Sequence, residues 1–241
     1  MSSEELLKEE ALKTISKIRE EGRTDNEICL ELIKLTRLLG NNFAENGENK
    51  NRKISLHKLI ENDCLHRILI LLDRRNSKEI QIHSALTLSA YLKSAGNPGC
   101  ENVSNYISIR LKHKESNDCI IAFSILANLF PLVPELAQKF ILSDGFILNL
   151  EKLVKKELKC KEAELAALEM LNAACMNTEC RGTISMLCKE WLMENVQRRP
   201  EYDFNGAVTK ASQPTATNIL LQSDNFNIIS DLSAVILAKL Q

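Results

Sequence analysis

Hydrophobic residues recur every three or four positions along most of the chain, and this spacing predicts amphipathic α-helices. The first 44 residues carry two such stripes, which end at Gly22 and Gly40, residues typical of helix C-termini. Residues 45–52 are polar and predict a linker. Beyond this linker, helices are predicted over residues 53–62, 64–74, 77–95, 99–113, 116–130, 132–143, 145–158, 160–176 and 178–196.

The end of the chain follows a different pattern. Residues 197–218 contain two prolines and a glycine among polar side chains, which predicts a long loop. Two short helices are predicted after it, near 216–222 and 225–240. The whole chain holds only 8 Gly and 5 Pro in 241 residues, and so few turn-forming residues argue against a fold made of many short strands.

Four segments share a mixture of Ala or Ser with large aliphatic residues, which allows neighbouring helices to pack closely. They are ALTLSAYL at 85–92, AFSILANLF at 122–130, AALEMLNAAC at 166–175 and SAVILAKL at 233–240. Their alignment places Tyr91, Asn128, Ala173 and Lys239 in register. The first two intervals, 37 and 45 residues, are close to the roughly 40–47 residues of armadillo and HEAT repeats. The third interval contains the predicted loop.

These repeats predict the fold. An apolar helix precedes the first and third segments, as in the armadillo order of a short helix, a second helix and a longer third helix with small residues. Such repeats stack because a single one cannot bury its own core. We therefore predict an all-α, armadillo/HEAT-like right-handed α-solenoid over residues 53–241, preceded by an N-terminal helical pair over 1–44. An irregular helical bundle is the alternative.

Charge and hydropathy exclude several kinds of partner. Lys and Arg number 31 against 32 Asp and Glu, so the net charge of −1 gives no basic surface for nucleic acid. No apolar run approaches the roughly 18 residues of a membrane-spanning helix. The first ten residues are acidic and contain no apolar signal-peptide core. A cytoplasmic protein without a membrane partner is expected.

The chemistry-bearing residues give no catalytic pattern. The eight cysteines include no CxxC pair, so we interpret them as reduced, mostly buried side chains, with a metal or redox role as the alternative. GxSxG, HExxH, P-loop and GxGxxG motifs are absent. His83 begins an apolar helix and is interpreted as a hydrogen-bonded structural residue. We expect no enzyme activity, cofactor, metal or small-molecule substrate.

Several segments in a fixed order resemble a known family. They are HSALTLSAYLKSAG at 83–96, FPLVPELA at 130–137, FILSDGF at 140–146 and AALEMLNAACMNTECR at 166–181. Over roughly residues 54–241 the chain resembles the central armadillo region of the UCS-domain myosin chaperones. It is most similar to the fungal members, which lack the TPR domain that binds a general chaperone.

This resemblance implies a co-chaperone that assists the folding and assembly of myosin motor domains without ATP. The implied partners are the myosin motor domain, a general chaperone and a second copy of the chain, with this region acting as the scaffold. The last predicted helix stops uncapped at Gln241, where the UCS region of the family should begin, so we expect a fragment. Myosin binding by this region alone is left open. The alternative function is a general armadillo adaptor that binds another cytosolic protein or peptide.

Candidate binding residues follow from the armadillo resemblance, because third helices line the concave face in that fold. Tyr91, Asn128 and Lys239 are the candidate groove residues. Asn128 resembles the armadillo asparagine that hydrogen-bonds an extended peptide, although only one of the four aligned positions is Asn. Trp191, the single tryptophan, is either a core residue or a solvent-facing binding anchor.

Overall fold

The computed structural model describes residues 3–41, 56, 58–143, 145–197 and 216–241. The described residues form helices and turns and include no strand. The predicted linker at 45–52 lies outside them, as does the predicted loop apart from its two ends. The all-α solenoid is confirmed.

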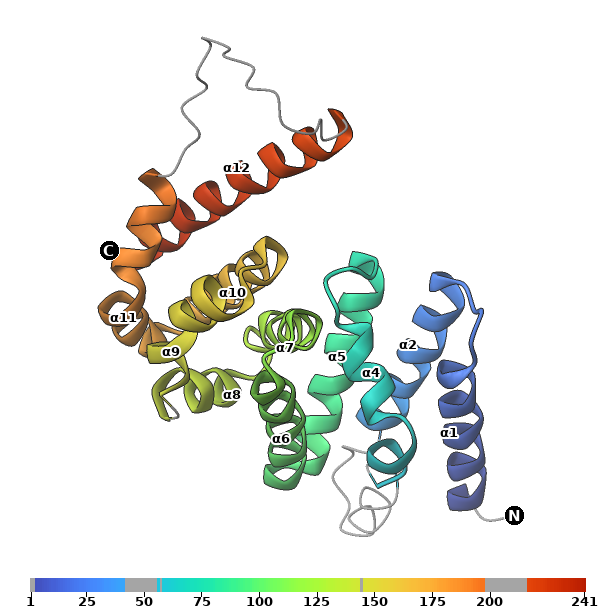
Figure 1. Ribbon diagram of the computed structural model, residues 1–241. Coiled ribbons are helices and arrows are strands. Elements are labelled where there is room, and N and C mark those ends of the chain that lie inside the picture. Colours follow the sequence, from blue (N-terminus) through green and yellow to red (C-terminus); the bar gives the residue numbers. More distant parts are fainter. Residues whose placement is uncertain (1–2, 42–55, 57, 144, 198–215) are drawn as a thin grey trace.

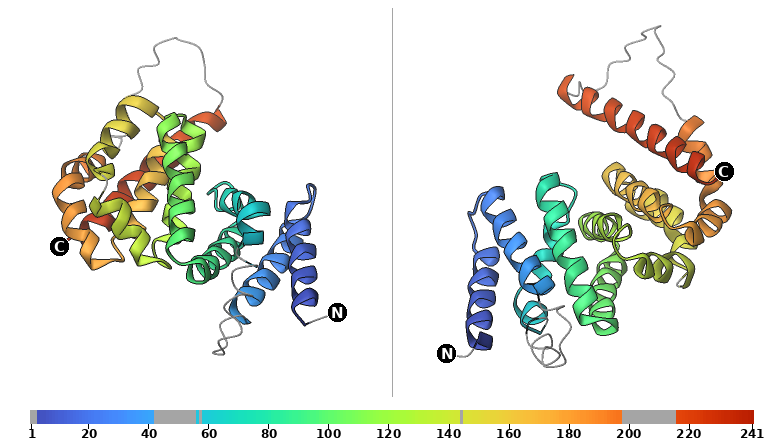
Figure 2. Two further views of the ribbon diagram at one scale, coloured as in Figure 1. Left: turned by 90° about the horizontal axis from the view of Figure 1, so that it is seen from below. Right: turned by 180° about the vertical axis from the view of Figure 1, so that it is seen from behind.

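The helices form a curved stack with an inner and an outer row (Figure 1). The inner row consists of α2 (Asp25–Asn41), α5 (Lys78–Ala95), α7 (Ser116–Leu129), α10 (Lys161–Ala174) and α12 (Ala216–Lys239). The outer row contains α4 (Leu65–Leu71), α6 (Asn97–His113), α8 (Pro134–Gln138), α9 (Phe146–Lys152) and α11 (Thr178–Gln197). α1 (Ser3–Arg19) begins the stack beside α2, and α12 lies at its other end (Figure 2).

The inner helices carry the repeated segments and pack against one another in order. The four similar segments lie on α5, α7, α10 and α12, so the predicted repeat units are the ones that stack. α2 packs on α5 in the same way and adds a fifth inner helix. One hydrophobic core runs through the stack from Ala11 to Ile236.

Two outer helices are each followed directly by a π-helical segment, whose turns are wider than those of an α-helix. The π-helical segment η1 (Lys139–Ser143) follows α8, and η2 (Leu153–Leu158) follows α9. Lys159 caps η2 and Lys114 caps α6, both in the left-handed conformation that closes many helices. π-helical turns are rare and occur frequently at functional sites.

One helix prediction was wrong. The sequence predicted two helices near 216–222 and 225–240, but α12 is continuous from Ala216 to Lys239. No Gly or Pro lies between residues 216 and 241, so nothing in that stretch forbids the helical backbone.

Candidate protein-binding site

A groove of about 390 Å³ opens where four inner helices meet. α5, α7, α10 and α12 all contribute to its wall. We call it the inner groove, and its lining residues are Lys78, Gln81, Ala127, Asn128, Pro131, Glu169, Asn172, Ala173, Met176 and Lys239. The structure thus brings together two of the four predicted binding residues, Asn128 and Lys239.

Two asparagines in the inner groove each use one atom of the side-chain amide in a hydrogen bond. The other amide atom of each has no partner among the described residues. Asn128 Nδ2 donates to the carbonyl of Ser124 at 2.8 Å, and its Oδ1 accepts no hydrogen bond within the described residues. Asn172 Oδ1 accepts from Lys239 Nζ at 2.7 Å, and its Nδ2 has no acceptor in the described part of the chain. The two asparagines therefore offer one hydrogen-bond acceptor and one donor to the backbone of a bound peptide.

Gln81 forms part of the floor of the groove. Its side chain is buried, and Nε2 donates to the carbonyl of Asn76 at 2.7 Å. Its Oε1 accepts from Lys78 Nζ at 3.1 Å. Gln81 thus holds the turn before α5 in place beneath Asn128, whose Nδ2 lies 3.5 Å from Gln81 Oε1.

Charged side chains bracket the two asparagines. Arg74 lies in the turn before α5. One of its guanidinium nitrogens forms an ion pair with Oε1 of Glu169 on α10 at 3.4 Å. Its backbone N–H donates to Ser124 Oγ on α7 at 3.2 Å, so Arg74 ties three inner helices together. Lys78 and Lys239 add two cations to the groove wall against the single carboxylate of Glu169. The groove favours a ligand with carboxylates or exposed backbone carbonyls.

Tyr91, predicted as a groove residue, and Trp191, predicted as either a core residue or a solvent-facing anchor, both lie outside the inner groove. Both side chains are 0% exposed. Tyr91 belongs to the C-terminal half of α5, whereas α5 reaches the groove at its N-terminal end, through Lys78 and Gln81. Trp191 packs in the core, where its Nε1 donates to Glu164 Oε1 at 3.3 Å, so the core interpretation holds.

Asn172 is one of the groove residues that sequence reasoning missed. The alignment placed its neighbour Ala173, which also lines the groove, in register with Asn128. Pairing the asparagine of ILANL with that of MLNAA gives an interval of 44 residues, from 128 to 172, which also fits an armadillo repeat. The signal was present in the sequence.

A family model described as myosin-binding striated muscle assembly central matches residues 31–241. The chain belongs to this family. The match starts inside α2 and includes every helix that lines the inner groove. No curated protein and no solved structure matches the chain. The resemblance to the central region of the UCS-domain myosin chaperones is confirmed.

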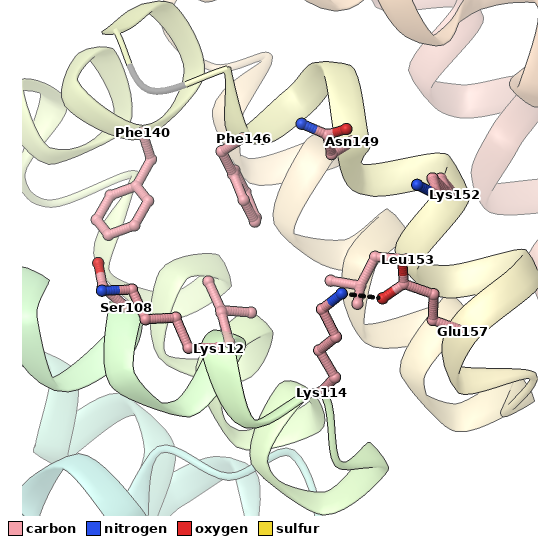
Figure 3. Close-up of a pocket in the computed structure, with 10 residues that line it drawn as sticks. Ser108, Lys112, Lys114, Phe140, Phe146, Asn149, Lys152, Leu153 and Glu157 are labelled. Atoms are coloured by element: carbon pink, nitrogen blue, oxygen red, sulfur yellow. Dashed lines mark ion pairs between the residues drawn. The ribbon is translucent and has the colours of Figure 1, made fainter.

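This member of the myosin-binding assembly family has a second hollow on its outer side. A pocket of about 430 Å³, which we call the outer pocket, lies between α6 and the α9–η2 helix. Its apolar part includes Phe140 and Phe146, whose rings meet edge to face at 5.9 Å between centroids (Figure 3). The remaining lining residues are Ser108, Leu111, Lys112, Lys114, Asn149, Lys152, Leu153 and Glu157.

The rim of the outer pocket is basic. Lys114 pairs with Glu157 at 2.9 Å (Figure 3), but Lys112 and Lys152 have no ion-pair partner among the described residues. The π-helical segments η1 and η2 supply Phe140 and Glu157 to the same pocket. An apolar floor beneath unpaired lysines suits a large apolar side chain that has carboxylates beside it.

The cysteines are mostly buried, as predicted. Cys29, Cys64, Cys119, Cys175, Cys180 and Cys188 are buried, and Cys100 and Cys160 are half-buried. Burial raises the pKa of Cys64 and of Cys188 to about 12, and that of Cys119 and of Cys175 to about 11. These four thiols stay protonated at neutral pH and are poor nucleophiles.

Within the described residues, every helix falls short of the length and apolar character that a membrane crossing requires.

Proposed function

We propose that this chain is the client-binding scaffold of a myosin chaperone and that the inner groove holds an extended segment of an incompletely folded motor domain. Membership of the myosin-binding assembly family supports myosin as the client. The observation that carries the proposal is the pair of half-occupied amides, Asn128 and Asn172, on neighbouring inner helices.

In this proposal the groove binds backbone and charge together. Asn128 Oδ1 accepts a backbone N–H of the client segment, and Asn172 Nδ2 donates to a backbone carbonyl. Lys78 and Lys239 attract a client carboxylate from the groove wall. Recognition of backbone atoms leaves the side-chain sequence of the client largely unrestricted, which suits a chaperone.

The outer pocket serves as a second contact with the same client. We assign to it an apolar side chain flanked by carboxylates, which matches the phenylalanine floor and the unpaired Lys112 and Lys152. Two contacts on one rigid stack fix the orientation of a client better than either contact alone. Catalysis and ATP have no part in the proposal. A general chaperone as a further partner, self-association and a cytoplasmic location belong to it through the family resemblance.

The experiment uses the whole chain and a purified myosin motor domain. Light scattering during mild heating measures protection from aggregation, and capture on immobilised chain measures binding. The N128A/N172A variant should weaken capture about tenfold or more, because two hydrogen bonds of roughly 1 kcal/mol each are lost. The matched control N26A/N105A replaces two exposed asparagines away from the groove and should bind as the unmodified chain does.

Two outcomes would contradict the proposal. A chain that neither captures nor protects the motor domain cannot be its client-binding scaffold. Equal loss of capture in N128A/N172A and N26A/N105A would show that the inner groove does not contact the client. Capture of other cytosolic proteins without myosin would favour the adaptor function instead.

A further inference from the structure

Three possible metal ligands meet where α2 packs on α5. The Sγ atom of Cys29, a carboxylate oxygen of Glu79 and a ring nitrogen of His83 all lie within 4.8 Å of one another. Glu79 and His83 are one helical turn apart on α5, so their side chains share a face. Cys29 reaches the same point from α2, which packs beside α5 (Figures 1 and 2).

These three side chains have no competing interactions. Across the described residues, none of them makes a hydrogen bond or an ion pair. His83 therefore lacks the hydrogen bond expected of a structural histidine. Burial and the negative charges of Glu79 and Asp25 raise the pKa of the Cys29 thiol, so a metal ion has to displace its proton. The carboxylate of Glu79 supplies a negative charge that attracts a cation.

The exposure of the cluster suits an ion that enters from solvent. Cys29 is 3% exposed, His83 is half-buried and Glu79 is exposed, so an ion can reach the cluster from solvent through the Glu79 carboxylate. Thiolate, imidazole and carboxylate are the three ligand types that zinc takes in proteins. A soft thiolate beside an imidazole selects against magnesium and calcium, which prefer oxygen ligands.

We propose that Cys29, Glu79 and His83 bind a divalent transition-metal ion of the zinc class, with water in the fourth position, and that this ion ties α2 to α5. Binding displaces the thiol proton of Cys29 into solvent and forms the metal–sulfur bond. Thr36 and Thr87 already share a hydrogen bond of 2.8 Å between the same two helices. The ion adds a second tie nearer to the N-terminal end of each helix.

Cobalt(II) is the probe for the first test, because a thiolate ligand gives cobalt(II) a charge-transfer absorption band. The whole chain, stripped with a chelator under reducing conditions, is titrated with cobalt(II) and then with zinc(II). We expect the band to saturate at one ion per chain and to vanish when zinc replaces cobalt. Zinc should also raise the melting temperature by several degrees, because it binds the folded chain.

Variants assign the ligands. C29S should abolish the band, and H83Q and E79Q should weaken cobalt binding about tenfold or more. The control C160S removes a half-buried cysteine outside the cluster and should keep the full band. Glu79 is exposed and His83 half-buried, so E79Q and H83Q remain informative if C29S disturbs the core. Circular dichroism of each variant checks that the helices persist.

Several results would overturn the proposal. Titration of the unmodified chain without a thiolate band would exclude the site. A band that survives in C29S, or that disappears in C160S, would place the ion on other cysteines. An equal zinc-induced rise in melting temperature for the unmodified chain and H83Q would show that the ion acts elsewhere.

Discussion

Thr36 on α2 and Thr87 on α5 lie with their Oγ1 atoms 2.8 Å apart. Thr87 is fully buried, and its hydroxyl also lies 3.2 Å from the carbonyl oxygen of Leu32. This small polar cluster sits inside the hydrophobic contact that joins the first two helices to the rest of the stack. Its loss should therefore weaken the packing of α2 on α5.

Replacing Thr87 by Val keeps the shape of the side chain and removes the hydroxyl. We expect T87V to lower the free energy of unfolding by about 1 kcal/mol, the usual net worth of a hydrogen bond. Urea unfolding followed by circular dichroism measures this value. The double variant T36V/T87V should cost less than the sum of the two single variants. T183V on α11, the control, should change stability little, and additive effects at 36 and 87 would contradict the coupling.

The architecture could be predicted from sequence because it depends on local patterns. Helix α5 was predicted over 77–95 and occupies Lys78–Ala95, and α7 was predicted over 116–130 and occupies Ser116–Leu129. Apolar spacing and the scarcity of Gly and Pro carry that information. The predicted repeats stack because the small residues within each segment allow close approach.

The direction of individual side chains could not be predicted in the same way. On α10, Ala166, Ala167 and Leu168 are all buried, so this helix is covered on several faces and its periodicity does not show which face meets the groove. The alignment therefore selected Ala173 and missed that the adjacent Asn172 also lines the groove. The cluster of Cys29 with His83 was out of reach because it joins residues far apart in sequence.

Gly99 provides a test of the packing between α5 and α6. A Cβ atom at Gly99 would lie 2.7 Å from the Cβ of Ala95 and 3.4 Å from Cε1 of Tyr91. Because these neighbours are buried or half-buried, G99A should lower the free energy of unfolding by about 1–3 kcal/mol. The matched control is G182A on α11, where a Cβ meets nothing within 4 Å.

G182A should be neutral or stabilising by up to about 1 kcal/mol, because alanine favours the helix over glycine. Thermal unfolding of the two variants side by side measures the contrast. A G99A protein as stable as G182A would mean that α5 and α6 separate more easily than their contact indicates.

Charge reversal tests the contribution of the outer pocket to client binding separately from that of the inner groove. Lys112 and Lys152 lie on its rim without ion-pair partners in the described structure. K112E/K152E should weaken capture of a myosin motor domain about tenfold at low salt and less at high salt, because charge attraction is screened. Stability should stay unchanged, since both lysines are exposed.

K93E/K189E, which reverses two exposed lysines outside the pocket, is the control for net charge. Surface plasmon resonance at two ionic strengths distinguishes the two variants. Identical binding by both would show that the outer pocket makes no contact with the client.

The carboxyl group of Glu31 makes the stability of the fold depend on pH. Burial opposes the ionisation of its carboxyl, but hydrogen bonds from Lys34 at 2.9 Å and Lys17 at 3.3 Å outweigh this and hold its pKa below the usual value of 4.5. A carboxyl with a lowered pKa in the folded state stabilises the fold above its unfolded pKa, and this contribution is lost as pH falls through the folded pKa.

E31Q should therefore be less stable than the unmodified chain at pH 7, by about 1 kcal/mol because both lysines are partly exposed. The difference should shrink below about pH 4.5, as urea unfolding across pH can show, whereas exposed E10Q should give no such trend. A stability difference that stays constant from pH 7 to pH 3 would mean that the charge of Glu31 does not contribute.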